Sequence, residues 1–115
     1  MKTVLGNIAY TRSGDKGPNA NVGIIFINKK FYEWGKKHIT SPSLKKYLMD
    51  LVKGDIKRYE LSNLNALNFI LHDSLGGGGS ETLINDAQGK TFGQILSVME
   101  INIPENLTEY INLND

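Results

Sequence analysis

Four consecutive glycines, Gly76–Gly79, divide this chain of 115 residues into two parts. Glycine lacks a Cβ atom and permits close backbone approach, but it loses more conformational entropy on folding than any other residue. Neither flanking part carries enough apolar sequence to bury a comfortable core alone, so we expect both to belong to one domain. With Ser80 the glycines also spell the flexible linker GGGGS, so a linker or a plain surface loop is the alternative to a functional segment.

The charge balance and the cysteine content exclude several classes of protein. Thirteen basic and twelve acidic residues leave a net charge of +1, which argues against a dedicated nucleic-acid-binding domain. The GxxG motif at Gly14–Gly17 is also found in KH domains, but there it lies between helices, whereas here it is predicted between strands. The chain has no cysteine, which excludes disulfides and thiolate chemistry. We therefore predict no nucleic-acid partner.

Membrane insertion and export are also not expected from this sequence. The N-terminus has no apolar segment of the kind found in secretory signals. No apolar run approaches the roughly 20 residues that a transmembrane helix needs. We expect a cytoplasmic protein without a membrane partner.

Hydrophobic periodicity predicts short strands interrupted by amphipathic helices. The predicted strands are Val4–Thr11, Asn21–Ile27, Ile56–Leu61, Leu67–Leu71, a short one at Thr82–Ile84, and a closing one at Ile101–Ile103. The predicted helices are Lys30–Lys37, Pro42–Lys53 and Thr91–Met99. Residues 105–115 form a polar C-terminal tail after a domain that spans residues 1–104.

The helix over Pro42–Lys53 has the strongest pattern. Ser41 is expected to cap its N-terminus, Pro42 suits its first turn, and Gly54 is expected to end it. Lys45 and Lys46 are expected to lie on its solvated face.

This order of elements predicts an α+β domain. Helices between strand pairs favour a ferredoxin-like two-layer sandwich, with a mostly antiparallel sheet, helices on one face and an extra N-terminal strand.

The segment Arg12–Pro18 is predicted to be a loop with an anion-binding character. Arg12 and Lys16 offer charge-assisted donors to a phosphate or carboxylate, and Gly14 and Gly17 free nearby backbone N–H groups. Ser13 and Asn21 complete this part of the candidate ligand-binding set, and Gly76, Gly77, Gly78 and Gly79 complete the other part. A charged turn that joins two strands is the plain alternative.

Two residues are candidates for acid/base catalysis. Histidine is a common acid/base group in enzymes, which makes His72 one candidate, and Asp15 lies in the charged segment. A histidine after an apolar run is more often structural, and Asp15 can instead pair with Arg12 or Lys16. The two histidines, His38 and His72, lack the spacing of metal ligands, so we predict no metal and no cofactor.

Several sequence blocks, taken in order, resemble the small ferredoxin-fold domain of the acyclic terpene utilisation (AtuA) family. The blocks are Arg12–Gly17, Ala20–Ile24, Leu51–Leu61, Ala66–Gly79 and Asp86–Leu96. The resemblance covers nearly the whole chain, from about Leu5 to Pro104. It departs at Pro18–Asn19, where an acidic and a small residue are expected.

The resemblance implies that the glycine run belongs to the domain and that the fold is ferredoxin-like. It also implies that a free-standing copy partners a larger AtuA-like subunit in acyl-CoA or branched-acid catabolism. Three functions follow as hypotheses. The first is an accessory domain that shares an acyl-CoA or carboxylate site with that subunit. The second is an independent hydratase, lyase or isomerase acting on a hydroxyacyl or enoyl thioester. The third is a ligand-free homo-oligomeric structural protein.

Overall fold

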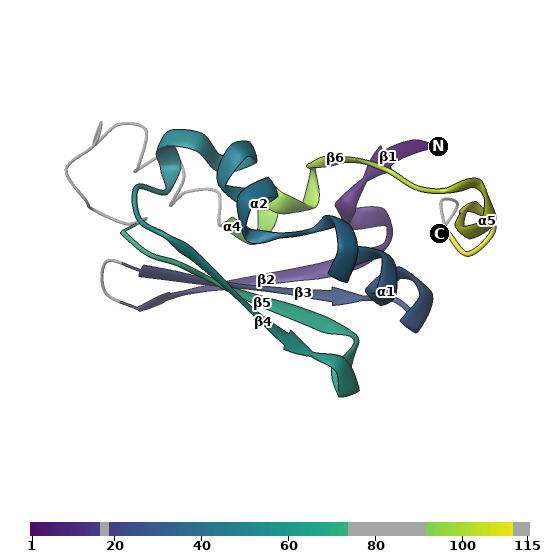
Figure 1. Ribbon diagram of the computed structural model, residues 1–115, viewed down its shortest axis with the longest axis horizontal. Coiled ribbons are helices and arrows are strands. Elements are labelled where there is room, and N and C mark those ends of the chain that lie inside the picture. Colours follow the sequence, from purple (N-terminus) through teal and green to yellow (C-terminus); the bar gives the residue numbers. More distant parts are fainter. Residues whose placement is uncertain (17–18, 74–91, 112–115) are drawn as a thin grey trace.

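A computed structural model describes residues 1–16, 19–73 and 92–111 of the chain (Figure 1). Its strands are β1 (Lys2–Val4), β2 (Ala9–Lys16), β3 (Asn19–Phe26), β4 (Ile56–Leu61), β5 (Ala66–Leu71) and β6 (Glu100–Asn102). Its α-helices are α1 (Lys29–His38), α2 (Ser41–Leu48), α4 (Phe92–Ser97) and α5 (Glu105–Thr108). Three short 3-10 helices lie between them: η1 (Leu5–Asn7), η2 (Met49–Leu51) and η3 (Ser62–Leu64).

The main sheet has four antiparallel strands in the order β2–β3–β5–β4. The two most apolar strands, β3 and β5, lie in its centre, where both of their edges are hydrogen-bonded. The N-terminal strand β1 does not join this sheet and pairs with β6 instead, with Thr3 opposite Ile101. The predicted antiparallel α+β architecture with an extra N-terminal strand is confirmed.

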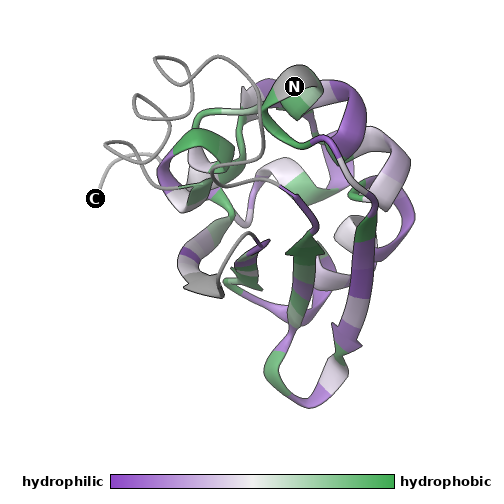
Figure 2. Cartoon of the chain, turned by 90° about the vertical axis from the view of Figure 1, so that its left-hand side faces the viewer, coloured by the Kyte–Doolittle hydropathy of each residue, from purple (hydrophilic) through white to green (hydrophobic). Residues whose placement is uncertain are grey.

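Helices α1, α2 and α4 lie on one face of the main sheet, and the other face carries no described element (Figure 1). Burial alternates strictly along β3 because successive side chains of a strand point to opposite faces. Hydrophobic and hydrophilic residues follow one another along the same strands (Figure 2). The fully buried side chains include Leu5, Ile8, Val22, Ile24, Phe31, Tyr32, Leu44, Leu67, Phe69, Leu71, Leu96 and Ile103.

Side chains cap the N-termini of both long helices. The side chain of Asn28 accepts a hydrogen bond of 2.9 Å from the backbone N–H of Phe31 at the start of α1. Thr40, and not Ser41 as predicted, caps α2. Thr40 and Ser43 form a reciprocal capping box, in which each side-chain oxygen accepts the other residue's backbone N–H. The cap lies one residue earlier than predicted. With Thr40 as the N-cap, Ser43 occupies the third helical position, where its hydroxyl completes the capping box.

The helix α2 is shorter than its periodicity predicted. It ends at Leu48 instead of Lys53, because Met49 takes a φ of 48° and the chain continues as η2. Gly54 therefore does not end the helix. It lies against His72, where an added Cβ would stand 2.7 Å from the His72 carbonyl oxygen.

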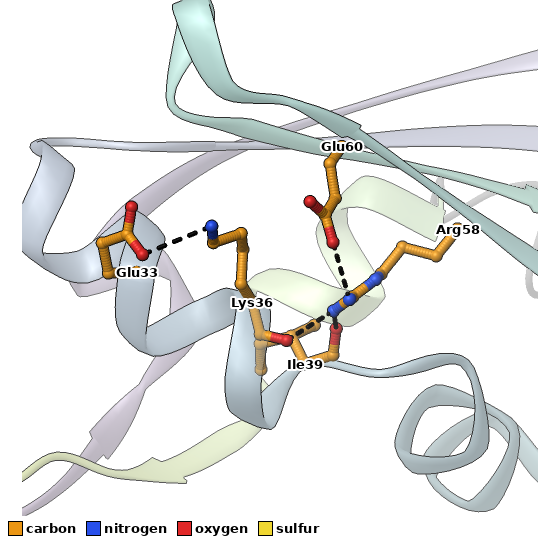
Figure 3. Close-up of polar contacts among 5 residues, drawn as sticks. All are labelled: Glu33, Lys36, Ile39, Arg58 and Glu60. Carbon is orange, nitrogen blue, oxygen red and sulfur yellow. Dashed lines mark hydrogen bonds and ion pairs between the residues drawn. The ribbon is translucent and has the colours of Figure 1, made fainter.

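Arg58 joins α1 to the sheet (Figure 3). Its Nη1 donates hydrogen bonds to the carbonyl oxygens of Lys36 (2.8 Å) and Ile39 (2.9 Å) at the C-terminal end of the helix. Its Nη2 lies 3.1 Å from a carboxylate oxygen of Glu60. The last carbonyl groups of a helix lack partners within the helix, so this guanidinium satisfies them and complements the helix dipole.

Candidate functional site

The segment predicted as the loop Arg12–Pro18 is a strand as far as Lys16. In β2, Arg12 pairs with Gly23, Ser13 with Val22 and Gly14 with Asn21. The strand prediction stopped too early because a row of polar and glycine residues shows no apolar alternation. Pairing with the apolar strand β3 overrides that local pattern.

The side chains of Arg12 and Ser13 take different environments on this strand. Arg12 is exposed and forms no ion pair with any residue that the structure describes. Ser13 is half-buried on the face that packs toward the helices, opposite the buried Val22. Arg12 is therefore available to an external anion, whereas Ser13 is less accessible.

Gly14 is not required by packing. A Cβ atom added there would meet nothing within 4 Å, and the residue opposite, Asn21, is half-buried. Glycine weakens a strand, and it often marks a site where a ligand or another backbone approaches closely. Packing within the sheet therefore gives no reason for a glycine at residue 14, whereas the close approach of a ligand or a partner would.

The backbones of Asp15 and Lys16 close the β2–β3 ladder, opposite Ala20 and Asn19. Their side chains, and the whole of Gly17 and Gly76–Gly79, lie outside the described residues, as does the predicted strand Thr82–Ile84.

His72 and Asp73 continue directly from β5 toward the glycine run. The backbone of His72 is held on both sides: its N–H donates to Asp55 (3.0 Å), and its carbonyl accepts from Gly54 (3.0 Å). Asp73 then takes a φ of 55°, which turns the chain out of the strand direction. The segment that precedes the glycine run is thus fixed to the segment that precedes β4.

Asn19, the first residue of β3, contacts the chain just after β5. Its Oδ1 accepts a hydrogen bond of 2.9 Å from the backbone N–H of Asp73. In the next row of the sheet Ala20 pairs with Leu71. The first residue of β3 and the second residue after β5 therefore lie at the same end of the sheet, which the sequence alone did not show.

The imidazole of His72 has one polar atom without a partner. Its Nε2 is buried and forms no hydrogen bond with the described residues. Asp15, the other acid/base candidate, lies on β2, and β3 separates that strand from β5. Two strand spacings are about 10 Å. The two backbones are thus too far apart for a tight catalytic pair without a bridging group.

Lys45 supports this end of the sheet from the helix layer. Its Nζ donates to the carbonyl oxygens of Val52 and Gly54 (2.6 Å for the latter). The prediction that Lys45 lies on a solvated face is wrong, because α2 ends early and the chain folds back beneath its last turn. A basic residue in the last helical turn is the signal that could have indicated this role.

The described residues contain no group of three histidines or carboxylates placed to hold a metal ion. Across the same ranges, no helix combines the length and apolar character needed to cross a membrane.

The family model of the AtuA ferredoxin-like domain matches residues 3–102. No curated protein and no solved structure gives a match. The family match begins at the second residue of β1 and ends with β6, so it includes most of the paired terminal strands as well as the main sheet.

Proposed function

This chain belongs to the family of AtuA ferredoxin-like domains, and from that membership we propose that it is an accessory subunit of a larger AtuA-like protein. In this proposal the two proteins share a binding site for an acyl-CoA or a related carboxylate. The observation that supports the proposal is the hydrogen bond between Asn19, which begins β3, and Asp73, the last described residue before the glycine run.

Arg12 and Gly14 supply the chemistry expected of an anion site. They point to the same face of β2, because residues two apart in a strand share a face. Arg12 is exposed and unpaired among the described residues, and Gly14 leaves its backbone open. A guanidinium binds phosphate or carboxylate with paired hydrogen bonds. Lys16, Gly17 and the glycines 76–79 belong to this proposed site by their position in the sequence.

The sheet face opposite the helices has the composition of a protein-binding surface. We call it the outer face; its register rows place Tyr10 and Leu61 in one row and Arg12 and Tyr59 in the next. Tyr10 is 70% exposed and Tyr59 51% exposed. Tyrosine and arginine are enriched in protein interfaces, where they bury a large area at little entropic cost. The outer face is therefore the proposed docking surface for the larger subunit.

Co-expression with a larger AtuA-like protein, followed by native mass spectrometry, tests the partnership. The proposal predicts a stable complex that carries both chains. Tyr10→Glu should weaken it, whereas Val98→Glu should not, because Val98 is similarly exposed (63%) but follows α4 on the helix side. A lone monomer or a homo-oligomer, with no complex, would reject the proposal.

The unpartnered Nε2 of His72 favours a second candidate, an independent hydratase or lyase. In that function His72 is the acid/base group, and the glycine backbone binds the thioester oxygen. Hydration of crotonyl-CoA by the isolated chain, lost in His72→Gln and retained in His38→Gln, would establish it. No turnover by the isolated chain would leave the accessory function as the better account.

A further inference from the structure

A groove of about 580 Å³ runs between the edge of the small β1–β6 sheet and the two long helices. One wall is formed by residues 99–102, which include the whole of β6. The opposite wall is formed by residues of α2 and by the end of α1. The groove lies on the helix side of the main sheet, so it is separate from the outer face (Figure 1).

The edge of β6 that faces away from β1 has unpaired backbone groups. The Leu5 N–H donates to Met99 (2.9 Å), and the Ile103 N–H donates to Met1 (2.8 Å). In an antiparallel ladder, every second residue turns its N–H and C=O toward the partner strand. Met99, Ile101 and Ile103 therefore face β1, and Glu100 and Asn102 direct their backbone groups to the other side. No described strand pairs with them there.

The helical wall presents a continuous face. Ser43, Lys46 and Tyr47 are three and four residues apart on α2, so they share one side of that helix. Trp34 stacks on His38 at the end of α1, with ring centroids 5.1 Å apart. Between the walls lie the apolar side chains of Ile39, Met99 and Ile101. An apolar cleft thus runs beside an open strand edge.

The polar groups of the groove are divided between those already bonded and those still free. The Ser43 hydroxyl is occupied by the capping box, and the Tyr47 hydroxyl donates to the Ile95 carbonyl (2.9 Å). Lys46 is exposed and has no ion pair among the described residues. The groups without a hydrogen bond or ion pair among the described residues include those of the strand edge and the rings of Trp34 and His38, with Lys46 and Glu100 as charged side chains in the lining.

We propose that this groove binds an extended peptide segment of a partner protein, which adds as a strand to β6. An exposed strand edge accepts another strand through main-chain hydrogen bonds, and a neighbouring pocket selects alternate side chains. The bound segment places a large apolar side chain between Trp34 and Met99 and an acidic side chain near Lys46. This inference does not depend on the proposed acyl-CoA site or on the outer face.

Titration of the ¹⁵N-labelled full chain with a blocked heptapeptide, Ser-Glu-Val-Leu-Val-Glu-Ser, tests the proposal by NMR. The expected result is a saturable shift of the Glu100 and Asn102 amides and of the Trp34 indole, together with slower hydrogen exchange at Glu100 and Asn102. N-methylation distinguishes strand addition from general hydrophobic contact. Methyl groups on one set of alternate peptide amides should abolish binding, and those on the other set should leave it intact.

Two charge reversals provide a matched pair. Lys46→Glu should weaken binding of the acidic heptapeptide several-fold. Lys57→Glu should not change it, because Lys57 lies on the outer face, opposite Ile70. Absence of shifts at Glu100 and Asn102, or equal binding of both N-methylated sets, would overturn the proposal. Shifts that depend on protein concentration without peptide would identify the groove as a contact between copies of this chain and would also overturn it.

Discussion

The side-chain oxygen of Asn19 accepts the backbone N–H of Asp73 at 2.9 Å, across 54 residues of sequence. One residue of the pair begins β3 after the hairpin, and the other immediately precedes the segment that leads to the glycine run. The contact fixes the position of Asn19, at the start of β3, relative to Asp73, just after β5. The proposed shared site rests on this proximity.

Asn19→Ala should lower stability modestly and disrupt the candidate site. Loss of one hydrogen bond costs about 0.5–1.5 kcal/mol of unfolding free energy, measurable by urea denaturation. Asn63→Ala is the matched control, because Asn63 is exposed in η3 and lacks a described partner. Equal effects of the two substitutions would show that the contact with Asp73 does not fix this end of the sheet.

Gly54→Ala should be much more harmful than Gly14→Ala. The new Cβ at residue 54 would lie 2.7 Å from the His72 carbonyl oxygen and 2.9 Å from the His72 Cβ, whereas at residue 14 it would meet nothing within 4 Å. Forcing an extra methyl group into a packed site costs about 1–3 kcal/mol. Thermal denaturation compares the two variants, and a Gly54→Ala protein as stable as Gly14→Ala would contradict the close packing of His72.

Arg58→Met should destabilise the contact between α1 and β4. It keeps the length of the side chain but removes both hydrogen bonds to the helix carbonyls, at 2.8 and 2.9 Å. Hydrogen bonds that involve a charged group contribute about 1.5–3 kcal/mol. Glu60→Gln is the control and should change stability little, because an exposed ion pair contributes about 0–1 kcal/mol. A larger loss in Glu60→Gln than in Arg58→Met would reverse this assignment.

Tyr47 should make stability depend on pH in the alkaline range. Burial raises the pKa of its hydroxyl above the ordinary value of 10.0. The unfolded chain therefore releases this proton at a lower pH than the folded chain does. The contribution of Tyr47 to the free energy of unfolding is fully present below pH 10. It is lost as the pH rises through the pKa of Tyr47 in the folded protein.

Denaturation of the wild type and of Tyr47→Phe at pH 9 and above measures this effect. The difference in the free energy of unfolding between the two proteins should change over this range, because only the wild type carries the Tyr47 hydroxyl. Tyr59→Phe is the control on the exposed outer face. A constant difference between wild type and Tyr47→Phe would contradict the assigned pKa direction.

Local patterns predicted the central strands and the position of the helices well. The apolar runs that became β3 and β5, and the helical spacing that includes α4, are local features of the sequence that can be recognised without knowledge of the fold. The segment Val4–Thr11 was predicted as one strand and is two, separated by η1. The backbone N–H of Leu5 donates to the carbonyl oxygen of Met99, nearly a hundred residues away in the sequence. No local pattern indicates this partner.

The site depended even more on tertiary partners. The functional residue types were visible in the sequence, but Lys45 was interpreted as a solvated residue and no tertiary partner was predicted for Asn19. Each acts through a contact with backbone atoms, Asp73 N–H for one and the Val52 and Gly54 carbonyls for the other. Backbone atoms carry no sequence signature, so such contacts become visible when the fold is known.

Isothermal titration of isovaleryl-CoA into the complex with a larger AtuA-like protein, and into this chain alone, tests the shared site most directly. The account predicts measurable binding by the complex and at least roughly tenfold weaker binding by the isolated chain, a difference of about 1.4 kcal/mol. Equal affinity of the isolated chain and the complex would contradict the shared site and would place the ligand within one protein.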